Sequence, residues 1–166
     1  MGVKAMFLLG EKLDGRDGHQ VGRELLAKLY TQTTGEPLPE ISVTSNGKPY
    51  FTDSKWHFSI SHTKKHAFCA LSDAPIGIDA EEADRKIDLR LADKILSPAE
   101  KARFDAAENK QQSLLQLWVL KEAAAKLSGK GLRGYPNHTD FELSDSRVRI
   151  IDGCYVAILQ EEHHVI

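Results

Sequence analysis

Two short stretches of the sequence carry side chains whose types and spacing could do chemistry. The first is residues 76–81, Ile-Gly-Ile-Asp-Ala-Glu, where two acids stand one residue apart at the end of an apolar run. On a strand, residues i and i+2 point the same way, so the carboxylates of Asp79 and Glu81 converge while Ala80 and Glu82 face the other side. Such a pair is costly to hold without a cation, and Mg²⁺ typically takes one or two protein carboxylates plus water and phosphate oxygens. The stretch allows a magnesium site; a solvated acidic strand end is the alternative.

The second stretch is residues 118–126, Trp-Val-Leu-Lys-Glu-Ala-Ala-Ala-Lys. Trp118, Glu122 and Lys126 follow one another at intervals of four, about one helical turn, and therefore share a helix face. A glutamate four residues before a lysine is also an ordinary surface ion pair, worth a few tenths of a kcal/mol. The pair alone therefore does not distinguish a reactive site from a solvated helix face.

Two further patterns could suggest chemistry, but both lack the required spacing. His57, His62 and His66 do not form a zinc motif, because a strand would send His57 and His62 to opposite faces. Residues 128–131, Ser-Gly-Lys-Gly, lack the fixed spacing of a phosphate-binding loop and are more typical of a helix cap.

The composition is typical of a single soluble globular domain. The chain has 166 residues, of which 41% are hydrophobic and 28% charged, and its net charge of −2 does not favour a broad nucleic-acid surface. Cys69 and Cys154 each lie in an apolar run, which predicts buried thiols in a reducing compartment. The apolar patch near the start is too short for a signal peptide, and no stretch is long enough to span a membrane. We therefore expect a cytoplasmic protein without membrane or nucleic-acid partners.

Hydrophobic periodicity predicts the elements that must position these side chains. In the first half we expect a helix over 17–34 closed by Gly35, a hairpin over 40–51 around Asn46-Gly47, and strands over 56–62, 66–71 and 76–81. In the second half we expect helices over 88–96, 98–104 and 111–128, the second begun by Ser97 and Glu100, and strands over 141–143, 147–151 and 154–160 joined by turns at 145–146 and 152–153. Helix and sheet thus occur twice, and a cleft between two such units is a natural ligand site.

Four blocks of the sequence, taken in order, resemble the signature blocks of the phosphopantetheinyl transferases. They are Asn-Gly-Lys-Pro-Tyr at 46–50, Phe-Ser-Ile-Ser-His-Thr at 58–63, Ile-Gly-Ile-Asp-Ala-Glu at 76–81, and Leu-Trp-Val-Leu-Lys-Glu-Ala-Ala-Ala-Lys at 117–126 followed by Gly-Lys-Gly-Leu at 129–132. The resemblance covers roughly residues 22–143. It points to the Sfp-type branch, because a whole helix-and-sheet unit precedes the Gly-Ile-Asp block.

The resemblance implies an α+β fold made of two pseudo-twofold-related sub-domains, each a helix packed on a small, mainly antiparallel sheet. These would be roughly residues 1–75 and 76–166 of a single domain over 1–166, with coenzyme A in the cleft between them. The implied reaction is transfer of 4'-phosphopantetheine from coenzyme A to a serine hydroxyl of an apo carrier protein, with release of 3',5'-adenosine bisphosphate. The carrier could belong to fatty acid, polyketide or nonribosomal peptide synthesis, and the enzyme would act as a monomer.

The resemblance also implies the residues of the site. Asp79, Glu81 and Glu122 would surround Mg²⁺, with Mn²⁺ an open alternative. Glu122 would be the general base, directly or through a water, and Lys126 would balance charge on the phosphates. The residues implied to contact coenzyme A are Lys48, Ser61, His62, Lys121 and Lys126.

The chain departs from the family pattern before its first helix. By the resemblance it is shorter than typical Sfp-type members and lacks most of a basic segment that contacts the 3'-phosphate in the family. Arg16, Arg23 and Lys28 are the available substitutes. The alternative function is therefore a catalytically impaired module that binds coenzyme A, a nucleotide or a carrier protein.

Overall fold

The structure is a computed structural model that describes residues 5–130 and 139–161. Its first half contains strand β1 (Met6–Lys12), helix α1 (Gly18–Thr34) and strands β2 (Ile41–Val43), β3 (Pro49–Phe51), β4 (His57–His62) and β5 (His66–Ser72). Strands β1, β5 and β4 form an antiparallel sheet with β5 in the middle, and β2 and β3 form a separate hairpin.

The second half repeats the combination of helices and a three-stranded sheet. It contains strand β6 (Ile76–Glu82), a short 3₁₀ helix η1 (Leu89–Leu91), helices α2 (Ala92–Ile95), α3 (Pro98–Ala106) and α4 (Lys110–Ser128), and strands β7 (Val148–Ile151) and β8 (Cys154–Gln160). Strand β8 lies between β6 and β7 and is antiparallel to both. None of the described helices is long and apolar enough to cross a membrane.

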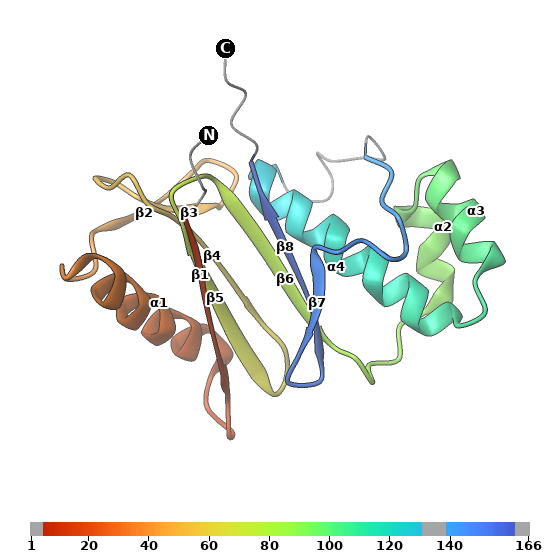
Figure 1. Cartoon of the computed structure of the whole chain (residues 1–166), viewed down its shortest axis with the longest axis horizontal. Coiled ribbons are helices and arrows are strands. Elements are labelled where there is room, and N and C mark those ends of the chain that lie inside the picture. The colour runs from red at the N-terminus through yellow and green to blue at the C-terminus, as the bar shows by residue number, and fades with distance from the viewer. Residues whose placement is uncertain (1–4, 131–138, 162–166) are drawn as a thin grey trace, which may run out of the picture.

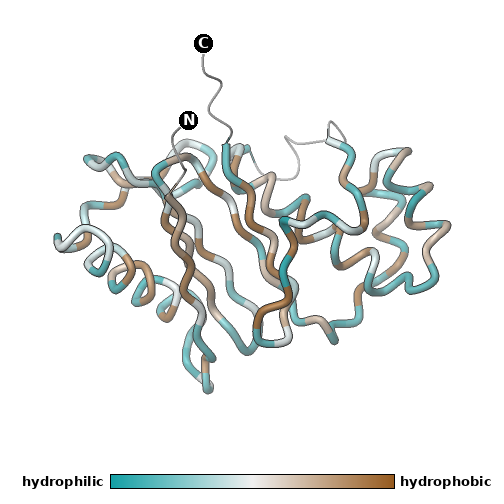
Figure 2. Tube along the Cα trace, viewed as in Figure 1, coloured by the Kyte–Doolittle hydropathy of each residue, from teal (hydrophilic) through white to brown (hydrophobic). Residues whose placement is uncertain are grey.

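The elements stack as four layers in the order α1, first sheet, second sheet and α4, with α2 and α3 beside α4 (Figure 1). Hydrophobic residues gather along the central strands, and the loops at the strand ends are mostly hydrophilic (Figure 2). A hydrophobic core fills each of the three spaces between layers. Representative buried residues are Val21, Leu26 and Leu71 between α1 and the first sheet, Phe68, Ile78 and Val156 between the sheets, and Leu117, Leu120 and Leu159 between the second sheet and α4.

The two halves meet where β4 runs beside β6, and side chains rather than a backbone ladder join these strands. The Ser59 hydroxyl accepts a hydrogen bond from the Ile78 amide at 3.0 Å, and the Ser61 hydroxyl accepts one from the Ala80 amide at 3.1 Å. Each serine therefore satisfies a buried backbone donor on the strand that carries the acid pair.

Helix α4 lies unusually close to β6 because residue 77 is glycine. A Cβ atom placed on Gly77 would stand 2.2 Å from the carbonyl oxygen of Ala123 and 2.5 Å from the amide nitrogen of Leu127. Only a residue without a side chain allows this approach. The approach sets the separation between the strand of Asp79 and the helix of Glu122.

Most of the elements that the sequence predicts are present, and local capping explains their ends. Asp17 caps α1 by accepting from the Gln20 amide at 2.9 Å, and Gly35 and Gly129 close α1 and α4 in the left-handed conformation. Ser97 and Glu100 form a reciprocal capping box at the start of α3. Gly129 is thus a helix cap, as expected of the Ser-Gly-Lys-Gly stretch, whereas residues 131–132 lie outside the described residues.

Three sequence predictions need correction. The expected strand over 141–143 is wrong, because the Phe141 amide donates to the Glu100 carboxylate at 2.9 Å and its ring is buried near α4. Asp145-Ser146 consequently joins no hairpin; the turn at 152–153 alone joins β7 and β8. The helix expected over 88–96 is divided into η1 and α2. Strand β1 was not predicted.

Candidate active site

A cavity of about 370 Å³ lies where α1, the β2–β3 turn, β4 and α4 meet. It brings together segments from both halves of the chain, including three of the four sequence blocks that resemble the family signature. The lining side chains that can bind or react are His19, Arg23, Asn46, Lys48, His62, Glu122 and Lys126. Most are basic or neutral, which suits a ligand that carries phosphate groups.

Asp79 lies behind the cavity wall, next to Lys126. It is only 7% exposed, and its Oδ1 accepts from Lys126 Nζ at 3.2 Å and from the Ser61 hydroxyl at 3.3 Å. Its Oδ2 is also buried and has no hydrogen-bond partner within residues 5–130 and 139–161. Burial raises the pKa of Asp79 to about 7; Lys126 opposes this rise, and the negative charges of Glu122 and Glu81 add to it.

Glu122 and Lys126 lie on one face of α4, as their spacing predicts, and both line the cavity. Lys126 Nζ also donates to the carbonyl oxygen of Ile60 at 3.3 Å, so it links α4 to both β4 and β6. Burial raises the pKa of Glu122, the neighbouring Lys126 opposes that rise, and Glu81 adds to it. A half-buried carboxylate with a raised pKa beside a cavity is suited to accept a proton.

Asp79, Glu81 and Glu122 carry oxygen atoms of the type that a hard divalent cation binds, but among the described residues these three carboxylates do not converge within 4.8 Å of one another. Glu81 and Glu122 each raise the pKa of Asp79, so the three carboxylates repel one another in the absence of a positive charge. The unpartnered Oδ2 of Asp79 is a buried ligand atom without a competing donor. The Glu81 carboxylate is paired with Arg85, so a cation there would compete with an ion pair. Mg²⁺ and Mn²⁺ both prefer such oxygen ligands.

Of the side chains implied to contact coenzyme A, Lys48, His62 and Lys126 line the cavity. Lys48 Nζ donates to the carbonyl oxygen of Leu127 at 2.8 Å, near the end of α4. Burial lowers the pKa of Lys48, and the carboxylate of Glu161 partly offsets this. Ser61 is not a lining residue; its hydroxyl donates to Asp79 and accepts from the Ala80 amide.

The structure corrects the implied position of Lys121, which does not line the cavity. Its side chain is 6% exposed, and its Nζ lies 2.6 Å from the Oε1 of Glu100, between α3 and α4. Adjacent helix positions are turned by about 100°, so Lys121 and Glu122 cannot share a face. In this structure Lys121 is therefore a buried ion-pair partner on another face of α4.

The sequence did not predict His19 as a lining residue, and it left three basic residues open as substitutes near the first helix. Arg23 lines the cavity, whereas Arg16 pairs with Glu11 at 3.1 Å. His19 and Arg23 are four residues apart on α1 and so share a face. That spacing was the available signal for His19.

Comparison with known proteins places this arrangement in a family. Residues 75–161 match the family model described as the 4'-phosphopantetheinyl transferase superfamily, which is more than half of the chain. The chain therefore belongs to the 4'-phosphopantetheinyl transferase superfamily, as its sequence blocks predict.

Curated relatives of the chain include bacterial proteins of this name. The chain is 35% identical to 4'-phosphopantetheinyl transferase gsp of Aneurinibacillus migulanus over 116 residues. The matched segment is 68% of this chain and 48% of the relative. It is 33% identical over 155 residues to a 4'-phosphopantetheinyl transferase of Bacillus subtilis, covering 89% of this chain and 66% of the relative. With 4'-phosphopantetheinyl transferase Sfp of Bacillus subtilis (strain 168) it shares 36% identity over 94 residues, 55% of this chain and 42% of that protein. The chain spans about half the length of the first and third of these relatives.

Proposed function

We propose that this protein transfers the 4'-phosphopantetheine group of coenzyme A to a serine hydroxyl of an apo carrier protein, with release of 3',5'-adenosine bisphosphate. One observation carries the proposal: Glu122 and Lys126 line a cavity directly in front of the buried Asp79, whose Oδ2 has no partner among the described residues. These positions support a proposed cation site, base and ammonium group at the edge of a space that basic residues line.

In this proposal Asp79, Glu81 and Glu122 hold Mg²⁺. When bound, the ion supplies positive charge to the pyrophosphate oxygens, which the attack of a neutral hydroxyl on a dianion requires. Lys126 places a second positive charge at the same edge of the cavity. Because Lys126 is anchored by Asp79 and by the Ile60 carbonyl oxygen, its ammonium group needs little reorganisation.

Glu122 is the proposed general base. The carrier serine oxygen forms a bond to the phosphorus that bears pantetheine, the bond from that phosphorus to the bridging pyrophosphate oxygen breaks, and the serine proton passes to the Glu122 carboxylate. The leaving group is 3',5'-adenosine bisphosphate. The raised pKa of Glu122 brings its basicity closer to that needed near neutral pH.

The nucleotide end of coenzyme A is proposed to lie along α1 and the β2–β3 turn. Lys48, His62 and Arg23 line this part of the cavity and are suitable donors for a phosphate monoester. Arg23 is our proposed substitute for the basic contacts that the family pattern places before the first helix. Lys48 is held against the end of α4, so its ammonium group is positioned before a ligand binds.

We further propose that the two halves, roughly residues 1–75 and 76–166, form a single domain that works as a monomer. The core between the two sheets includes residues from both halves, which supports one folding unit. The cavity likewise takes its lining residues from both halves of one chain, so a second copy is not needed to complete it.

The proposed function is tested by the intact mass of apo carrier proteins incubated with this protein, coenzyme A and Mg²⁺. A gain of one phosphopantetheine group that disappears with a chelator is expected. Carriers from fatty acid, polyketide and nonribosomal peptide synthesis should be compared. Coenzyme A binding measured by calorimetry, without transfer to any of these carriers, would contradict the proposed transferase and support a binding module.

A further inference from the structure

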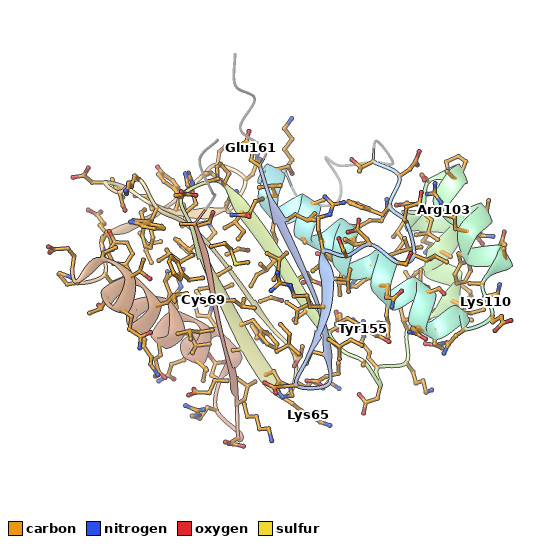
Figure 3. All side chains as sticks on the ribbon, viewed as in Figure 1. Lys65, Cys69, Arg103, Lys110, Tyr155 and Glu161 are labelled. Carbon is orange, nitrogen blue, oxygen red and sulfur yellow. The ribbon has the colours of Figure 1, made fainter. Side chains whose placement is uncertain are left out.

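A second group of chemically active side chains lies at the opposite ends of the sheets from the β2–β3 hairpin. His66 begins β5 of the first sheet, whereas Glu82 ends β6 and Cys154 begins β8 of the second sheet. Glu82 and Cys154 are directly opposite each other in the antiparallel pairing of β6 and β8, and His66 approaches them from the facing sheet. Figure 3 labels Lys65, the neighbour of His66 in sequence, at this end of the strands.

The three side chains converge on one point. His66 Nδ1 lies 2.7 Å from Glu82 Oε1 and 3.4 Å from Cys154 Sγ, and all three ligand atoms fall within 4.8 Å of one another. Among the described residues this is the one group of three or more histidine, cysteine or acidic side chains that converges so closely. The residues are separated by 16 and 88 positions in the sequence, so spacing along the chain does not reveal the group.

We propose that His66, Glu82 and Cys154 form a metal site that binds Zn²⁺, separate from the carboxylate site of Asp79. A thiolate, an imidazole nitrogen and a carboxylate oxygen are zinc ligands, whereas a magnesium site would not use sulfur. On binding, the thiol loses its proton to solvent and no electron is transferred. The site requires no coenzyme A and does not depend on the proposed transferase activity.

The orientation of the His66 ring also suits a ligand. Its side chain is 8% exposed, and its Nε2 has no hydrogen-bond partner in the described part of the chain. Nδ1, which faces Glu82 and Cys154, is therefore the nitrogen available to an ion, and Nε2 would carry the ring proton. The Thr63 hydroxyl donates to the same Glu82 oxygen that faces His66, as expected for a group that orients a ligating carboxylate.

The cluster opens onto a cavity of about 650 Å³ that has no lining residue in common with the candidate active site. The charged and ligating side chains that line this cavity are His66 and Glu82, three aspartates and three lysines: Asp14, Asp84, Asp152, Lys12, Lys64 and Lys65. Three protein ligands would leave one position of a tetrahedral ion open to a water molecule from the cavity. Because the ligands come from both sheets, the ion would link the two layers at this end.

The experiment uses the metal-free full chain with Co²⁺ as an optical probe and Zn²⁺ as its competitor. We expect one thiolate-bound Co²⁺ per chain, seen as a thiolate-to-cobalt charge-transfer absorption, and its displacement by Zn²⁺ but not by Mg²⁺. Cys154→Ser removes the absorption. Cys69→Ser is the matched control, because Cys69 is the other buried free thiol and lies in the core beneath α1.

Glu82→Gln is a second test that still applies if Cys154→Ser fails to fold. It keeps the size of the side chain and alters one ligand atom. We expect Glu82→Gln to weaken Zn²⁺ binding by roughly 10-fold or more. Added Zn²⁺ should raise the melting temperature of the wild-type chain and of Glu122→Gln, but not that of Cys154→Ser. The proposal is overturned if no thiolate absorption develops, or if Cys154→Ser binds Co²⁺ with an unchanged spectrum.

Discussion

Lys126 Nζ lies 3.2 Å from Asp79 Oδ1, and this contact joins helix α4 to strand β6 across 47 residues of sequence. It is the direct link between two stretches whose residue types suggested chemistry in the sequence. The contact also explains how a carboxylate that is 7% exposed is tolerated without a bound cation. Asp79 is therefore held between a lysine that favours its charge and a buried environment that opposes it.

Asp79→Asn should change how stability depends on pH. The folded pKa of Asp79 is about 7, above the ordinary value of 3.8, so the folded chain binds this proton more tightly than the unfolded chain. The wild-type chain therefore loses stability as pH rises from about 4 to 7, by roughly 1.4 kcal/mol per pKa unit at most. Asparagine does not titrate. In urea unfolding without divalent cations, the stability of Asp79→Asn relative to wild type should increase between pH 4 and pH 8; a constant difference would contradict this assignment.

Glu122→Gln should abolish transfer to the carrier but still bind coenzyme A. Loss of a general base typically lowers turnover by about 10² to 10⁴-fold, whereas the neutral amide keeps the size of the side chain in the cavity. Turnover would be followed by carrier mass and coenzyme A affinity by calorimetry. Glu108→Gln, an exposed change just before α4, is the control with unchanged turnover. Full activity in Glu122→Gln would remove the assignment of Glu122 as base.

Lys48→Met should weaken coenzyme A binding by removing a contact to its 3'-phosphate. A lost charge-assisted hydrogen bond costs about 1.5 to 3 kcal/mol, or roughly 10 to 100-fold in affinity. Dephospho-coenzyme A, which lacks the 3'-phosphate, should bind the variant and the wild-type chain equally. An equal loss of affinity for both ligands would show that Lys48 does not bind the 3'-phosphate. Lys94→Met on α2 provides a distant lysine control.

Lys121→Met should destabilise the fold without altering coenzyme A affinity. The change leaves the Glu100 carboxylate, which is 0% exposed, without its cation, and breaking a buried ion pair typically costs about 3 to 5 kcal/mol. Glu100 keeps its backbone donors at Ser97 and Phe141, which continue to stabilise part of its negative charge. Urea unfolding and calorimetry separate the two effects. A selective loss of coenzyme A binding in a stable Lys121→Met variant would restore its implied role at the phosphates.

Gly77→Ala should separate α4 from β6. The added Cβ would meet backbone atoms of Ala123 and Leu127, which cannot rotate away as a side chain can. Overpacking of this kind costs about 1 to 3 kcal/mol, and we expect turnover to fall with stability because the helix carries Glu122. Gly15→Ala is the control: nothing lies within 4 Å of its Cβ position, and its cost comes from φ of +83° alone. Equal effects of the two substitutions on turnover would argue against the packing explanation.

Much of the local structure was predictable because its signals are local. The caps of Asp17, Ser97 and Gly129 and the Asn46-Gly47 turn each depend on residues within a few positions. Strand β1 was missed because none of its residues is fully buried, and its partner β5 lies about 60 residues further along the chain. The strand predicted at Phe141 failed because a distant carboxylate binds its amide.

The candidate site likewise combines features that follow from local sequence with features that depend on packing between distant segments. The shared face of Glu122 and Lys126 follows from helical spacing, but their closeness to Asp79 depends on how α4 packs against β6. Lys121 was placed at the phosphates by resemblance, although its buried partner Glu100 cannot be found from spacing. The grouping of His66 with Cys154 likewise exists only once the two sheets face each other.

The central position of β8 has a consequence for the order in which the molecule is made. The first sheet is complete once residue 72 has been synthesised, so it can form with α1 on a nascent chain. The second sheet cannot form at the corresponding stage. Residues 76–128 already contain β6 and α4, but the middle strand of the sheet, β8, spans residues 154–160. Closing a long loop must precede that pairing, which slows folding. On the ribosome, the part of the apolar face of α4 that packs on β8 therefore remains uncovered until Cys154–Gln160 has emerged, and chaperone binding is expected during this interval.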